Sequence, residues 1–147
     1  MKKLFLLAVL AIGIKFSAHA QPQTATLNDP TAPILHFQTD TFNFDTITQG
    51  DVVKYDFKFT NTGKQPLVIT GASVTCGCTT PEIPKEPIGP GKSAVIHVQF
   101  NSAGKLGRQD KVVTVQSNNG TGTVEIHLIG IVLSPPAKSG TVPATAH

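Results

Sequence analysis

Residues 53–60, Val-Lys-Tyr-Asp-Phe-Lys-Phe-Thr, decide the fold class of this chain. Apolar side chains occupy every second position and alternate with charged or polar ones, which is the period of a half-buried β-strand. Other stretches with strand-like patterns are residues 34–37, 42–47, 66–74, 94–100, 113–116 and 123–128. None of these segments has a convincing helical period, so the sequence predicts an all-β protein.

Turn-forming residues separate the candidate strands, as in Asn61-Thr62-Gly63-Lys64 and Gly89-Pro90-Gly91. About seven short strands separated by turns are typical of a β-sandwich. Alternation with one polar face favours antiparallel sheets. We therefore predict an antiparallel immunoglobulin-like β-sandwich at residues 34–133. Four prolines in residues 81–92 predict an extended loop there rather than a strand.

The first twenty residues have the three parts of a secretory signal peptide. Lys2 and Lys3 precede an apolar run at residues 4–14, and Ala18-His19-Ala20 has the small-x-small pattern of a cleavage site. The run is shorter than the roughly 20 residues that span a bilayer. We expect cleavage after Ala20 and a secreted or periplasmic product, with no transmembrane segment in the mature chain.

The segments that flank the predicted sandwich have no strand or helix period. Residues 21–33 are rich in Thr, Pro, Asn and Gln and are predicted to form a flexible leader. Residues 134–147 are rich in Ser, Pro, Ala and Thr and are predicted to form a disordered tail.

The charge balance excludes two classes of function. The chain has 12 Lys and Arg, 9 Asp and Glu, and a net charge of +3. Lys2, Lys3 and Lys15 belong to the predicted signal peptide, so the mature chain has 9 positive and 9 negative side chains. A basic nucleic-acid footprint and a polybasic membrane patch are therefore both absent from the mature composition.

Cys76-Gly77-Cys78 is the strongest chemical signal, and it has three interpretations. An oxidising compartment favours a disulfide between the two cysteines, and Gly77 would allow the tight backbone that this ring demands. Alternatively, the two thiolates bind a soft ion such as Cu(I). The third interpretation is structural, with two small side chains placed where a strand leaves its sheet.

The metal interpretation needs further ligands, and the candidates besides Cys76 and Cys78 are His36, His97 and His127. His97 and His127 lie at outward positions of their predicted strands. In an immunoglobulin-like order those strands belong to different sheets, so we do not expect the histidines to form one cluster.

The other polar residues form no recognisable catalytic set. The carboxylates are scattered and have no spacing that suggests acid–base chemistry; they are Asp45, Asp51, Asp56, Glu82, Glu86 and Asp110. The sequence has no Gly-x-Ser-x-Gly elbow, phosphate-binding loop or His-Glu-x-x-His motif. We therefore predict no catalytic residues and, apart from the Cu(I) alternative, no cofactor.

An ordered set of short motifs resembles a bacterial exported family of unknown function whose signature is Cys-Gly-Cys-Thr. The motifs are Phe57-Lys58-Phe59-Thr60-Asn61-Thr62-Gly63, Pro66-Leu67-Val68-Ile69, Cys76-Gly77-Cys78-Thr79, Pro90-Gly91-Lys92-Ser93, Phe100-Asn101, Ser117-Asn118 and Gly130. The family is similar in fold to Hydin-type and major-sperm-protein-like immunoglobulin domains. The resemblance implies the sandwich fold, export and a Cys pair that belongs to the domain's pattern, but it implies no activity.

One position departs from the pattern of these domains, which often carry Gly in the first strand after an aromatic pair. Here Phe42-Asn43-Phe44 runs directly into Asp45-Thr46. The backbone bend at this point is therefore left open by the sequence.

Two functional hypotheses follow. The first is a non-enzymatic, exported immunoglobulin-like module that binds a protein or cell-envelope partner, with exposed edge strands as the means of pairing. The alternative is a thiol-based copper-binding or redox-sensing domain that uses Cys76 and Cys78.

Overall fold

The computed structural model describes residues 29–120 and 122–136, and these form the all-β sandwich that the sequence predicts. The predicted signal peptide and most of the predicted leader and tail lie outside the described residues. The described part contains eight strands rather than about seven. They are β1 (Leu35–Phe37), β2 (Thr41–Thr48), β3 (Val52–Asn61), β4 (Ile69–Val74), β5 (Thr79–Glu82), β6 (Ser93–Asn101), β7 (Gly107–Ser117) and β8 (Val124–Leu133). In this described part, no helix has the length and apolarity needed to cross a membrane.

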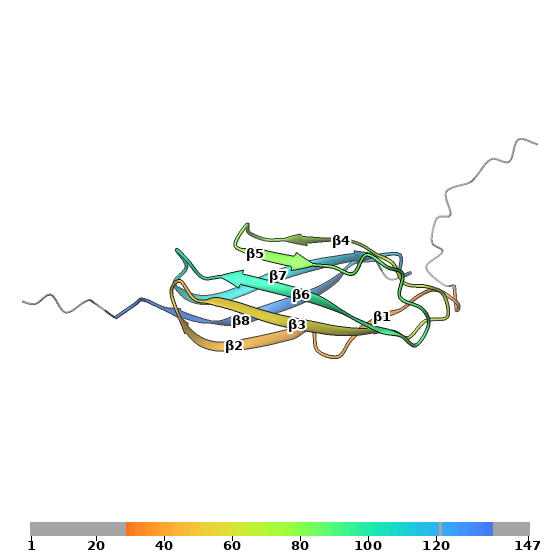
Figure 1. The fold of residues 1–147 in the computed structure, drawn as a ribbon, viewed down its shortest axis with the longest axis horizontal. Helices are drawn as coiled ribbons and strands as arrows, with labels where there is room; N and C mark the ends of the chain where they lie inside the picture. Colours follow the sequence, from red (N-terminus) through yellow and green to blue (C-terminus); the bar gives the residue numbers. More distant parts are fainter. Residues whose placement is uncertain (1–28, 121, 137–147) are drawn as a thin grey trace, which may run out of the picture.

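The strands form two four-stranded sheets that pack face to face (Figure 1). The first sheet has the order β1-β3-β6-β5 and the second has the order β2-β8-β7-β4. All pairs are antiparallel except β2 with β8, which is parallel and departs from the predicted arrangement. The cause is the short connection after β1, which carries the chain from one sheet to the other without a reversal of direction.

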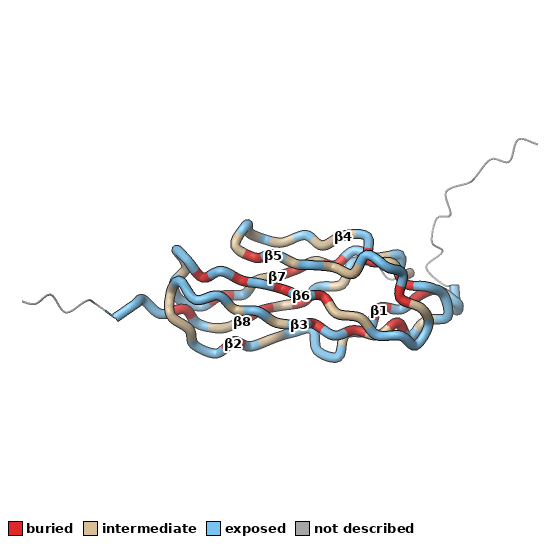
Figure 2. The backbone as a smooth tube through the Cα atoms, in the orientation of Figure 1, coloured by how far each residue is buried: buried red, intermediate tan, exposed pale blue. Residues whose placement is uncertain are grey.

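The core lies between the sheets and is built from the predicted alternation (Figure 2). In β3, Phe57, Phe59 and Asn61 are buried while the residues between them are exposed or half-buried. The fully buried apolar side chains come from both sheets and from one bridge segment; they are Phe57, Phe59, Leu67, Ile96, Val98, Phe100, Val113, Val115, Ile126, Leu128 and Val132. Burial of this continuous apolar layer makes the main favourable contribution to the free energy of folding of the two-sheet arrangement.

One prediction about the loops is wrong at its start. Residues 81–92 were expected to form a loop, but Pro81 and Glu82 belong to β5, where Pro81 lies opposite Val98. β5 is the edge strand of its sheet, and proline is tolerated there when its missing N–H faces away from the neighbouring strand. The remaining prolines of the segment lie outside any strand.

Asn61 ties three separate segments together at one end of the sandwich. Its side chain is fully buried, and its Oδ1 accepts hydrogen bonds from Ile34 N (3.2 Å) and Gly63 N (3.0 Å). Its Nδ2 donates to Gln65 O (2.8 Å) and Ile88 O (2.9 Å). All four hydrogen-bonding positions of the amide are therefore used.

The chain before β1 packs against the same corner. Ala32 N donates to Asp29 O (3.0 Å) in a turn, and Gln65 Nε2 donates to Thr31 Oγ1 (2.7 Å). Gly63 lies directly beneath this segment, because a Cβ on Gly63 would overlap the backbone of Ala32. The folded unit thus begins before position 34.

The bend in the first long strand is now defined. Asp45 has a φ of 57°, the left-handed conformation that Gly usually supplies, and the register of β2 against β8 shifts between Asn43 and Thr46. Asn43 Oδ1 accepts a hydrogen bond from Asp45 N (2.9 Å), which supports this conformation. The result is a β-bulge that turns the Phe44 ring onto Gly130.

Gly130→Ala is expected to destabilise the domain by about 1–3 kcal/mol, because the new methyl group would overlap the Phe44 ring and the Asp45 carbonyl. Urea denaturation of the two proteins measures the difference. The double variant Gly130→Ala/Phe44→Leu should lose less stability than the sum of the losses in the two single variants, since leucine leaves room for the new methyl group. Strict additivity would show that the contact is not the cause.

Candidate functional site

The cysteine pair lies in the tight turn that joins β4 to β5. Cys76 and Cys78 form a disulfide, with their Cα atoms 5.3 Å apart. Thr79 N donates to Cys76 O (3.3 Å), and Asn101 N donates to Cys78 O (2.9 Å). These two bonds fix the turn to the start of β5 and to the end of β6. Gly77 is exposed and the two cysteines are half-buried, so the disulfide is accessible from solvent.

Thr79 is the polar neighbour of both sulfurs, a role that the sequence did not predict. Its hydroxyl Oγ1 lies 3.8 Å from Cys76 Sγ and 3.9 Å from Cys78 Sγ, and the residue is only 4% exposed. A buried hydroxyl in this position can donate a hydrogen bond to a thiolate after the disulfide is reduced. The signal in the sequence was the fourth residue of Cys-Gly-Cys-Thr.

A positive charge lies over the ring of Phe100, the β6 residue that faces the start of β5. Phe100 is opposite Thr79 in the sheet, and Lys111 Nζ lies 5.4 Å from the centre of the Phe100 ring. Partial burial, with a smaller contribution from Lys105, lowers the pKa of Lys111. Contact with the ring face partly offsets the loss of hydration.

The three histidines considered as metal ligands lie far apart in the fold. His97 is on the outer face of β6 and His127 is on β8 of the other sheet, as predicted, while His36 is on β1 at the edge opposite the cysteine turn. Across residues 29–120 and 122–136, no group of three His, Cys, Asp or Glu side chains is placed to hold a metal ion. The disulfide-bonded sulfurs are also not thiolates, which are the form that binds Cu(I).

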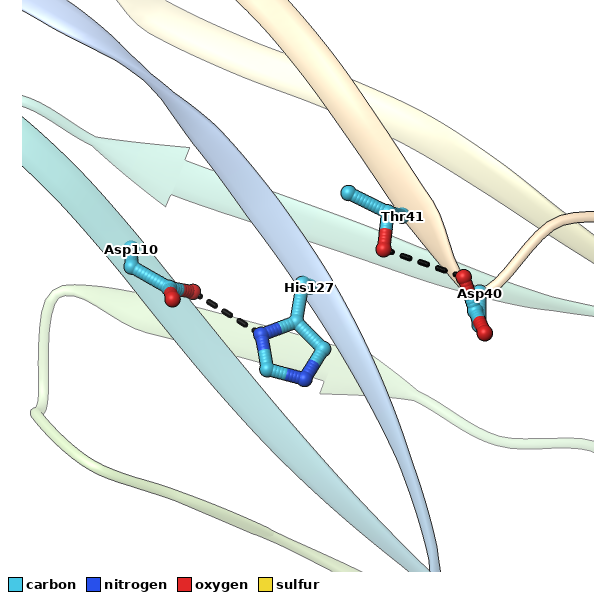
Figure 3. A network of polar contacts seen from close by, with 4 residues as sticks. All are labelled: Asp40, Thr41, Asp110 and His127. Carbon is cyan, nitrogen blue, oxygen red and sulfur yellow. Dashed lines mark hydrogen bonds and ion pairs between the residues drawn. The ribbon is translucent and has the colours of Figure 1, made fainter.

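Two histidines instead pair with carboxylates across neighbouring strands. His97 Nδ1 lies 2.7 Å from Asp56 Oδ1, and His127 Nδ1 lies 2.9 Å from Asp110 Oδ1 (Figure 3). Figure 3 also shows the separate bond from Thr41 Oγ1 to Asp40 Oδ1 (3.0 Å) at the start of β2. Both carboxylates are more than half exposed, so these are solvated surface pairs rather than a closed catalytic site.

The Asp56 hydrogen bond, helped by the negative charge of Asp56, raises the pKa of His97. This pair is therefore expected to stabilise the fold at pH values below the unfolded-state pKa, and its contribution disappears as the pH rises through the folded-state pKa. NMR titration of the His97 ring should show a lower pKa in Asp56→Asn. Asp110→Asn, which removes the equivalent partner on the other sheet, should leave it unchanged. An unaltered His97 pKa in Asp56→Asn would contradict the assignment.

Three of the four sheet edges are protected against pairing with another chain. On β5 the outward backbone positions are Thr79, whose N–H donates to Cys76 O, and Pro81, which has no N–H. The β2 edge is interrupted by the bulge at Asp45. β4 has a register shift of its own after Ile69 and lies beside β5 (Figure 1). Proline, bulges and covering elements are the usual protections of edge strands.

In the part of the chain that the structure describes, the β1 edge has no proline, bulge or covering element. Thr62 N donates to Ile34 O and Gln38 N donates to Lys58 O, so the even-numbered residues pair with β3. The N–H and C=O groups of Leu35 and Phe37 therefore point outward. Within residues 29–120 and 122–136, no strand lies on that side of β1. β1 is short, which limits pairing, but among the described residues neither a proline nor a bulge nor a covering element closes it.

Two facing sheets with the core between them place this chain among the immunoglobulin-like β-sandwiches. The ASH/PapD-like domain 7 of human CEP192 has this fold, with a TM-score of 0.55 at 12% identity over 84% of this chain and 99% of that domain. The chain belongs to the family described as "Protein of unknown function (DUF1573)", which matches residues 35–132. The predicted resemblance to an immunoglobulin-like family of unknown function is thereby confirmed.

Two bacterial structures are also similar. A protein of unknown function from Porphyromonas gingivalis W83 has a TM-score of 0.61 at 14% identity over 74% of this chain and 49% of that protein. The secreted serine protease VesC from Vibrio cholerae has a TM-score of 0.52 at 15% identity over 67% and 23%. This chain thus spans about half of the first and about a quarter of the second, and the likeness shows the fold alone. No curated protein matches the sequence.

Proposed function

We propose that this chain is an exported, non-enzymatic immunoglobulin-like module that binds a protein partner in the cell envelope. The observation that supports this proposal is the contrast among the sheet edges: within the described residues, only the short β1 has neither a proline nor a bulge nor a covering element. An unpaired edge is a template for a strand from another chain, so proteins that stay monomeric usually block it. An edge left open beside three blocked ones is what strand-mediated binding requires.

Export is the part of the proposal that rests on residues 1–20. Their charged, apolar and small-residue regions are those of a cleaved signal peptide, and an exposed disulfide is suited to an oxidising compartment. Mass spectrometry of the protein purified from its native host should give a chain that starts at Gln21 and is lighter than the dithiol form by two hydrogen atoms. An uncut chain that begins at Met1 would contradict export by this route.

Partner binding is tested with the envelope fraction of the native host. The tagged chain is expected to retain a protein from that fraction, and the purified pair should then bind with a defined stoichiometry in titration calorimetry. Failure of every retained protein to bind when purified would overturn the proposal. A substrate turned over by the chain would overturn the non-enzymatic part.

The position of Thr79 supports a second candidate, a redox-sensing turn. A thiol reductant would attack one sulfur to form a mixed disulfide and release the other as a thiolate, and a second thiol would complete the reduction and leave as the oxidised reductant. The Thr79 hydroxyl lies within reach of either released sulfur. Copper binding would follow only in this reduced form. Cys76→Ser/Cys78→Ser should then abolish any Cu(I) affinity.

Thr79→Val tests this candidate because it removes the hydroxyl and keeps the shape. In the reduced protein, the thiol pKa is expected to rise, and alkylation by iodoacetamide near pH 7 should slow several-fold because the thiolate is the reacting form. Thr80→Val is the matched control, since Thr80 is the exposed neighbour on the opposite face of β5. Equal alkylation rates in wild type and Thr79→Val would remove the redox role of this hydroxyl.

A further inference from the structure

A slot of about 390 Å³ lies beside the open β1 edge, where the chain crosses from one sheet to the other. It is lined by residues 35–40 and by Val124 at the start of β8. Leu35, Phe37 and Val124 provide its apolar side, and all three pack against the core. The slot thus has an apolar side that is continuous with the core and a polar side formed by exposed residues of β1 and of the crossing segment.

The second sheet reaches the slot at Val124, where β8 extends past the start of β2. β2 pairs with β8 only from Thr41 and His127 onward, and His127 N donates to Asp40 O (2.7 Å). By the alternation along β8, the N–H and C=O of Glu125 point to the same side as those of His127. Within the described ranges, no residue of β2 reaches Glu125. Glu125, the neighbour of Val124 in the chain, thus has backbone groups that β2 does not pair.

We infer that this slot receives an extended segment of the partner, which adds a strand to β1 and packs alternate apolar side chains against Leu35, Phe37 and Val124. The inference rests on the proposed function and identifies the site and the chemistry of its partner. Leu35 and Phe37 offer two donors and two acceptors at the spacing of a strand, about 7 Å for every second residue. A second backbone strand matches such a row, and aliphatic side chains match the surface of Leu35, Phe37 and Val124.

The added strand runs antiparallel to β1, as β3 does on the other side. In an antiparallel pair, residues opposite Leu35 and Phe37 exchange hydrogen bonds with them and direct their side chains to the same face. The partner's apolar residues therefore supply both the side chains that enter the slot and the N–H groups that bind β1. Its intervening residues face solvent and are free to be polar.

The probe is the peptide acetyl-Thr-Val-Thr-Val-Thr-amide added to the isotope-labelled mature chain. We expect NMR shifts and slower amide exchange at Leu35, Phe37 and Glu125. N-methylation of both valine nitrogens should weaken binding at least about tenfold, because it removes the donors to β1. N-methylation of the central threonine should leave binding unchanged, since that nitrogen faces away. Equal binding of the two methylated peptides, or no shift at Leu35 and Phe37 at millimolar peptide, would overturn the inference.

A protein variant provides the second arm. Val124→Lys places a charge in the slot and should abolish peptide binding, while Val52→Lys, at an exposed valine that also begins a strand, should not. If Val124→Lys fails to fold, the comparison of the two methylated peptides still tests whether the peptide pairs with β1. Shifts at Leu35 and Phe37 that grow with protein concentration in the absence of peptide would show a second copy in the slot and contradict the inference.

The outcomes for the envelope partner separate the two levels of the proposal. A partner that binds the native chain and not Val124→Lys supports both. If a partner binds the Val124→Lys variant as tightly as the native chain, the chain is still a binding module, but the slot is not its binding site. Absence of any partner rejects the proposed function itself.

Discussion

Asn61→Ala is expected to lower the free energy of unfolding by about 3–5 kcal/mol, because it removes a fully buried amide with four hydrogen bonds. The fully buried amide makes four hydrogen bonds, to Ile34, Gly63, Gln65 and Ile88. Alanine leaves two donors and two acceptors without this partner in a region that water enters only in part. Urea denaturation monitored by circular dichroism measures the loss.

Asn101→Ala is the matched control, because Asn101 is exposed and its side chain accepts one local bond, from Ala103 N (2.9 Å). Its cost should stay below about 1 kcal/mol. Asn61→Asp gives a second test, since it loses both donors and buries a charge. This variant should be less stable at neutral pH than in mild acid, where the carboxyl is protonated. If Asn61→Ala lowers the free energy of unfolding no more than Asn101→Ala does, the Asn61 amide does not stabilise this end of the sandwich.

Phe57→Ala is expected to cost about 3–5 kcal/mol, because it removes a fully buried ring from the centre of β3 and leaves a cavity. The ring contacts two other aromatic rings edge to face, those of Tyr55 (4.8 Å between centres) and Phe37 (6.5 Å). Val52→Ala on the same strand, at a valine that is 47% exposed, should change stability by less than about 1 kcal/mol. A thermal melt that shows a loss well under 1 kcal/mol for Phe57→Ala would contradict this placement.

Phe57→Ala should also loosen β1, since Phe37 rests on Phe57 and Phe59. Amide exchange at His36, whose backbone pairs with β3, is expected to accelerate more than exchange in β7.

The long strands were predictable because their period is local. Residues 53–60 alternate apolar and polar side chains, and the same face is buried in β3. β5 escaped prediction because Pro81 normally ends a strand, and only its position at a sheet edge makes it acceptable. The parallel pairing of β2 and β8 depends on the crossing after β1, which no local pattern encodes.

The candidate site was predictable only in part. Cys76-Gly77-Cys78 was identified from spacing, but the proximity of Thr79 to both sulfurs depends on the turn geometry. The pairing of His97 with Asp56 required the register of β3 against β6. The slot beside β1 arises where two sheets end at different points, and long-range pairing of this kind is absent from a single sequence.

The claim that this module binds its partner at the β1 edge is tested most directly by photo-crosslinking in the native host. A photoreactive amino acid replaces His36, which is exposed and lines the slot, or Thr80, which is exposed on the opposite edge strand. We expect a discrete covalent adduct from position 36 that disappears in Val124→Lys, and no adduct from position 80. No adduct from position 36, or the same adduct from both positions, would contradict it.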